Sequence, residues 1–157
     1  MHTPILVALK GDVTTVNATR RRARFDTDSF RMGIDTMASA CMSYSQEHFL
    51  DLREETGVEV KGIAAGLALQ GRGTLQFNID DDNGKMHTIT IPDSGYIPQL
   101  PLVLVSPQHW AQNTSDCVSE TTGEHGTTLR FRGTTKTVRH ADATHTPVFR
   151  TTQGTVR

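Results

Sequence analysis

The stretch best suited to chemistry in this chain is the pentapeptide DTMAS at residues 35–39. It follows the apolar segment FRMGI, so a carboxylate stands at the end of an expected strand. A carboxylate in such a position can serve as a general acid or base when its surroundings control its proton. The simplest alternative is a local turn, because an Asp–Thr pair often bonds its own backbone.

The composition favours a single soluble globular domain. The chain has 157 residues, of which 36% are hydrophobic and 21% charged, with a formal net charge of -1. This balance gives no reason to expect nucleic acid or a membrane as a direct partner. The basic cluster at residues 20–24 is interpreted as a solvated connector, since no further basic residues accompany it.

The cysteines and histidines do not indicate a metal site or a disulfide framework. Cys41 and Cys117 are too few for either, and the seven histidines lack the close spacing of zinc ligands. We therefore expect no metal and no cofactor. The N-terminal apolar run is too short for a secretory signal, and no stretch approaches the roughly 18 apolar residues of a membrane span. The expected location is intracellular, in the cytoplasm or within virus-like particles.

The elements that must position the acidic loop are mostly strands. We expect strands at residues 3–11, 30–35 and 40–45, with a helical turn in 45–52 whose apolar residues share one buried side. The residues assigned to that side are Phe49, Leu50 and Leu52.

The clearest local pattern is a hairpin over residues 74–91. Apolar and polar residues alternate on both sides of Asn83-Gly84, a favoured turn because both residues tolerate positive φ. The acidic run 80–82 lacks calcium-ligand spacing and is interpreted as a solvated turn. Gly71 and Gly73 indicate a bend or bulge in the first strand.

A buried strand and a short helix follow this hairpin. The continuous apolar run 102–105 predicts a strand buried on both faces, and Ser106-Pro107 predicts the start of a helix over 107–112. After Asn113 large apolar residues become sparse, and this change in composition suggests three segments. These are an N-terminal strand and basic connector (1–24), a core (25–116) and an extension (117–157) with candidate strands at 127–133 and 146–152, forming a β-hairpin or a linker toward integrase.

The order of these segments resembles the retropepsin-like (retroviral-type) aspartic proteases, and within them the protease segment of copia-like retrotransposon polyproteins of diatoms and related algae. IDTMAS resembles the family's Asp-Ser/Thr-Gly-Ala loop. GIAAGLALQGRGTLQF is similar to its flap and the following strand, and YIPQLPLVLVSPQHWAQ to the closing segment of the copia-like branch. The resemblance is strongest over residues 25–113. It implies an all-β fold, with a closed retropepsin-like barrel, a flap hairpin and one short helix.

The resemblance also implies an aspartic endopeptidase that processes its own polyprotein. One carboxylate activates water while a second, protonated, bonds the scissile carbonyl, and two carboxylates about 3 Å apart share one proton. Since the sequence has one such loop, the second Asp35 must come from another copy in a homodimer. Thr36 would bond across the dimer axis, with Ala38 and Ser39 keeping the loop compact.

A flap over the substrate is the second implied part of the site. Two glycines bracket a small-residue segment, which predicts a hairpin with a mobile tip. The residues assigned to flap and substrate binding are Ile63, Ala64, Ala65 and Gly66.

The sequence departs from the family at Met37, where glycine is usual. Methionine adds a flexible side chain to this loop. Two other interpretations therefore stay open: a catalytically inactive retropepsin-like domain with a structural or assembly role, and an unrelated β-rich binding domain in which Asp35 only caps a turn.

Overall fold

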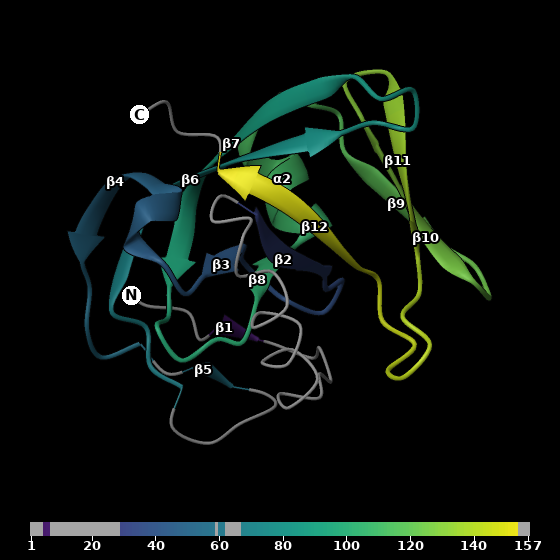
Figure 1. The fold of residues 1–157 in the computed structure, drawn as a ribbon. Coiled ribbons are helices and arrows are strands. Elements are labelled where there is room, and N and C mark those ends of the chain that lie inside the picture. The colour runs from purple at the N-terminus through teal and green to yellow at the C-terminus, as the bar shows by residue number, and fades with distance from the viewer. Residues whose placement is uncertain (1–4, 7–28, 59, 62–66, 154–157) are drawn as a thin grey trace.

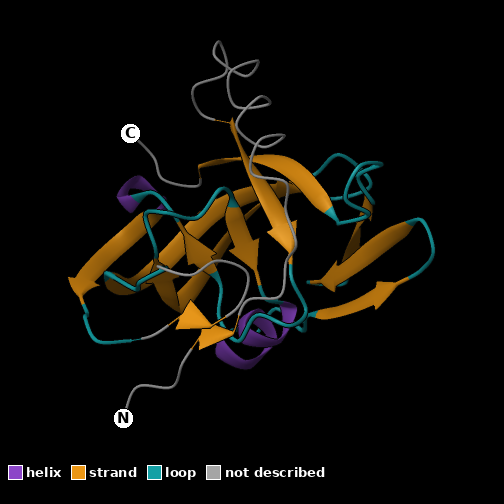
Figure 2. Cartoon of the chain, turned by 90° about the horizontal axis from the view of Figure 1, so that it is seen from below, coloured by secondary structure: helices purple, strands orange, loops and turns teal. Residues whose placement is uncertain are grey.

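The computed structural model describes residues 5–6, 29–58, 60–61 and 67–153, and these are mostly strands (Figure 1). Among them lie one α-helix, α2 (Pro107–Asn113), and one short 3-10 helix, η1 (Gln46–His48). Figure 2 shows that these two helical segments lie apart from one another. The described residues contain no helix that is both long and apolar enough to cross a membrane.

The strands form a seven-stranded sheet, a three-stranded sheet and a two-stranded pair. The large sheet has the order β12-β2-β8-β3-β7-β6-β4, the smaller one the order β11-β10-β9, and β1 pairs with β5 in parallel. The bounds are β1 Ile5–Leu6, β2 Ser29–Ile34, β3 Met42–Ser43, β4 Phe49–Glu54, β5 Val60–Lys61, β6 Gly71–Asp80, β7 Met86–Tyr96, β8 Val103–Val105, β9 Ser119–Thr122, β10 Gly126–Phe131, β11 Thr134–Arg139 and β12 Val148–Gln153.

The last strand brings distant parts of the large sheet together. β12 pairs with β2 along its length and also pairs with the end of β6, both in antiparallel orientation. The predicted extension strands are present as β10 and β12, but they do not pair with each other: β10 pairs with β9 and β11.

The predicted hairpin is confirmed as β6 and β7. Their inward positions face each other in register, as in the pairs Leu75–Ile91 and Phe77–Ile89. The turn is longer than predicted, because the amide of Asp81 bonds the carbonyl of Lys85, and only Gly84 of the Asn-Gly pair has positive φ. The backbone amides of Asn83 and Lys85 donate to Oδ1 of Asp81, and these hydrogen bonds stabilise the longer turn.

The predicted irregularity near the two glycines is confirmed. The β6–β7 register shifts between Gly73 and Leu75. At Gly73 a Cβ atom would overlap the carbonyl oxygen of Asp51 on β4. Glycine is therefore needed here because two backbones approach closely.

The segment after η1 differs from the prediction. Only residues 46–48 are helical, and β4 follows immediately. Phe49 is buried, but Leu50 is 55% exposed, since neighbouring side chains on a strand point to opposite faces. The expectation of one shared buried side was therefore wrong.

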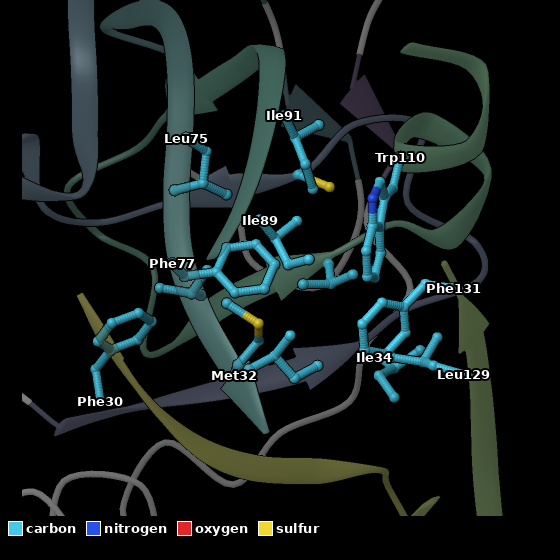
Figure 3. Packing of buried hydrophobic residues seen from close by; sticks show 14 of the residues in the cluster. Phe30, Met32, Ile34, Leu75, Phe77, Ile89, Ile91, Trp110, Leu129 and Phe131 are labelled. Carbon is cyan, nitrogen blue, oxygen red and sulfur yellow. The ribbon is translucent and has the colours of Figure 1, made fainter. Parts of the chain in front are cut away.

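The main hydrophobic core draws on both sheets (Figure 3). Phe77, Ile89 and Met32 come from the large sheet, and Trp110 comes from α2. Residues of the three-stranded sheet pack into the same cluster, so the segment after residue 116 supplies part of this core. These residues are Leu129, Phe131 and Val138.

The acidic run is only partly a solvated turn, which corrects the prediction: Asp80 and Asp82 are exposed, but Asp81 is buried, and all three carboxylates bond residues of other strands. Asp81 is buried and accepts hydrogen bonds from His87 Nε2 at 2.9 Å and from Thr134 Oγ1 at 3.0 Å. Asp82 accepts from the amide and hydroxyl of Thr137, and Asp80 accepts from a lysine of β11. The carboxylates therefore attach the three-stranded sheet to the β6–β7 hairpin.

Candidate functional site

Asp35 lies directly after β2 and is 5% exposed. β2 runs parallel to β8, and the amide of Asp35 continues this pairing by donating to the carbonyl of Val105 at 2.9 Å. Strand pairing therefore holds the backbone of Asp35, so the residue does not stand on an isolated surface turn.

The chain on both sides of the Asp35 loop is attached to the same strand. β2 leads into the loop and β3 leads out of it, and β8 lies between them and pairs with both. The run 102–105 was predicted to be buried on both faces, and β8 is fully buried in this central place. Such a loop has two fixed ends, which restricts where the carboxylate can move.

Inside the loop, backbone amides turn toward Asp35. The amide of Met37 donates to Asp35 Oδ1 at 3.0 Å, and the amide of Ala38 donates to the Asp35 carbonyl at 3.2 Å. Ala38 is buried, whereas Thr36 and Ser39 are exposed.

The departure at Met37 causes no backbone strain in this structure. Met37 is not among the described non-glycine residues with positive φ, so its conformation does not require glycine. Its side chain is 57% exposed and points out of the protein core. Within one chain, the flexible side chain of Met37 is therefore accommodated at the surface.

Residues at the start of α2 form hydrogen bonds with the Asp35 loop and with the chain that follows it. Ser106 is the N-cap as predicted: its hydroxyl accepts from the amide of His109 at 3.2 Å. The same hydroxyl donates to the carbonyl of Ala38 at 2.6 Å. His109 Nδ1 accepts from the amide of Cys41 at 2.9 Å.

The sequence analysis identified Ser106 only as a helix cap and missed His109 and Cys41. Spacing gives little signal for these contacts, because Ala38–Ser106 and Cys41–His109 are each 68 residues apart. The histidine in the first turn after the Ser-Pro cap was the available hint.

Cys41 does not compete with Asp35 as a reactive group. The residue is fully buried, and burial raises the pKa of its thiol to about 12. A thiol with so high a pKa holds very little thiolate at neutral pH, and thiolate is the nucleophilic form. Across the described part of the chain, no group of three or more potential metal ligands gathers.

The predicted flap falls outside the described residues. Ile63, Ala64, Ala65 and Gly66 all lie there, so their role stays a prediction. A pocket of about 670 Å³ is lined by described residues of η1, β4 and β7 and of adjoining loops, and Asp35 is not among them. Its lining residues are Gln46, Leu52, Glu54, Thr56, Gln70 and Tyr96.

Comparison with known proteins returned no match of this chain to a protein-family model, a curated protein or a solved structure.

Proposed function

We propose that this chain is a retropepsin-like aspartic endopeptidase that cleaves its own retrotransposon polyprotein. The active species is a homodimer, in which Asp35 of each copy supplies one carboxylate. One Asp35 takes a proton from water while the other, protonated, donates to the scissile carbonyl, and the roles depend on a shared proton.

The attachment of the Asp35 loop to β8 carries this proposal. Proton sharing requires two carboxylates held about 3 Å apart, which demands a backbone that does not drift. The pairing of β2 and β3 with the same strand provides such a hold in each copy. If Asp35 only capped a turn, its loop would not need to be attached to a strand at both ends.

Exposure of the loop is compatible with contact between two copies. Thr36 and Ser39 face outward next to the buried Asp35. In the proposed dimer, Thr36 bonds across the two-fold axis and brings both carboxylates to the same place.

The path of β12 supports the finer fold assignment. A closed barrel needs the two sides of a sheet to meet, and β12, at one end of the large sheet, pairs with β2 and with β6, the strand next to the other end. We propose that this strand is the seam of such a barrel, with residues 63–66 as the flap tip.

A second candidate function is an inactive domain of the same fold with an assembly role. The exposed side chain of Met37 favours it, because a large apolar group stands where the partner's loop must approach. Activity of the unaltered chain separates the two candidates.

The test is self-cleavage of a longer precursor that contains this chain. We expect the wild-type precursor to be cleaved and the Asp35→Asn precursor to remain intact. The side-chain amide of asparagine cannot replace a carboxylate in the pair that shares one proton. Asp142→Asn is the matched control, because Asp142 is an exposed turn residue.

Fragments are followed by gel electrophoresis and N-terminal sequencing, with circular dichroism as a check that each variant folds. Cleavage that persists in folded Asp35→Asn removes the proposed mechanism. A folded wild-type precursor that stays intact at every concentration favours the assembly role.

A further inference from the structure

The hydroxyl of Ser106 connects the Asp35 loop to α2 through one donated and one accepted hydrogen bond. It has one proton, which it gives to the carbonyl of Ala38, and it accepts from the amide of His109. Ser106 is fully buried, so water does not compete for these bonds. The loop is thus tied to the first turn of the helix.

The imidazole of His109 makes the second attachment, on the side where the loop returns to β3. Its Nδ1 accepts from the amide of Cys41, so Nδ1 carries no proton and the neutral ring has its proton on Nε2. A doubly protonated ring has no acceptor and cannot make this bond. The attachment therefore exists only while His109 is neutral.

The surroundings of His109 favour the neutral ring. Burial lowers the pKa of His109, Arg72 on β6 lowers it further, and Asp93 on β7 opposes both. The remaining residues of α2 are uncharged. The elements packed against α2 carry His87 and Asp93 on β7, Glu120 on β9, Asp116, which bonds Trp110, and Asp35 in the adjoining loop. Because the folded pKa lies below the ordinary 6.5, stability from the neutral ring is complete above pH 6.5 and is lost as pH falls through the folded pKa.

We propose that Ser106 and His109 are positioning residues that hold the Asp35 loop, and that His109 does so only in its neutral form. Neither touches the reacting atoms. The consequence for catalysis rests on the proposed function, whereas the hold on the loop does not. The acid side of a pH–activity profile then contains the loss of loop positioning by His109.

The experiment follows the Cys41 amide by hydrogen exchange and NMR across pH 4–8 in the full chain. In the wild type we expect its protection to fall about tenfold or more as His109 titrates, since a buried donor loses its acceptor. The Asp81 amide is the internal control, because it lies outside the Asp35 loop and bonds the carbonyl of Lys85. Nitrogen chemical shifts of the ring report the Nε2–H tautomer directly.

Two variants separate positioning from general stability. His109→Asn places a carbonyl oxygen near the position of Nδ1 that does not titrate, so protection of the Cys41 amide should persist at low pH. His109→Leu removes the acceptor and should lower protection at every pH. The wild-type titration and His109→Asn decide the matter even if His109→Leu does not fold.

The outcomes distinguish this inference from the proposed function. Unchanged Cys41 protection while the ring titrates, or an Nδ1–H tautomer, overturns the positioning role. If exchange behaves as expected but no precursor is cleaved, the endopeptidase fails and the positioning role stands. If both hold, His109→Asn should extend self-cleavage to lower pH relative to the wild type.

Discussion

Replacement of Asp116 by alanine should destabilise the whole domain. Asp116 accepts from Trp110 Nε1 at 2.8 Å and from Arg132 Nε at 2.8 Å, which joins α2 to the turn after β10. Trp110 is fully buried, so its orphaned N–H should cost about 1–3 kcal/mol. Arg132 is 38% exposed, so its ion pair adds only about 0.5 kcal/mol. The expected loss is about 1.5–3.5 kcal/mol.

The assay is urea unfolding followed by two probes. Trp110 is the single tryptophan of the chain, so its fluorescence reports on this site, and circular dichroism reports on the strands. A thermal scan should show a decrease in Tm of about 3–14 °C. Asp142→Ala, at an exposed turn residue, is the matched control and should stay within about 0.5 kcal/mol of the wild type.

A double-mutant cycle refines the test. In a Trp110→Phe background the donor is absent, so Asp116→Ala should cost only about 0.5 kcal/mol. A loss below about 0.5 kcal/mol in the original background would refute the reasoning. Separate transitions for the two probes would contradict a core shared by α2 and the three-stranded sheet.

Three further predictions concern acid stability, assembly and the loop. The hydrogen bond from His87 is the main reason why the pKa of Asp81 is lowered to about 2. The stability that Asp81 contributes is therefore present above its ordinary pKa of 3.8 and is lost as pH falls through about 2. Asp81→Asn should reduce this loss of stability in acid, as urea titrations at pH 2–5 can measure. Specific activity should rise with protein concentration until the dimer saturates, and excess Asp35→Asn chains should suppress wild-type activity. Sedimentation and cleavage assays at matched concentrations check both, and full activity in a monomer would exclude the shared pair of carboxylates. Met37→Gly should leave self-cleavage unchanged or increased, because the exposed side chain makes no core contact, and a large decrease would show that the loop depends on methionine.

Local patterns predicted several elements correctly for identifiable reasons. Alternation over residues 74–91 is a property of neighbouring side chains, so it predicted the β6–β7 hairpin. The Ser106-Pro107 start of α2 was equally local, since a cap bonds within one turn. The helical turn at residues 45–52 was over-extended because short apolar runs do not distinguish helix from strand.

The sequence by itself determined that a carboxylate stands at a strand end, followed by small residues, and that a capped helix comes about 70 residues later. Only the tertiary structure decided that β8 enters between the two sides of the Asp35 loop and that His109 bonds the amide of Cys41. It also decided that the carboxylates of the acidic run bond residues of β11. Contacts between residues far apart in the chain depend on how strands pair across the whole sheet, and this pairing leaves no periodic mark on the local sequence.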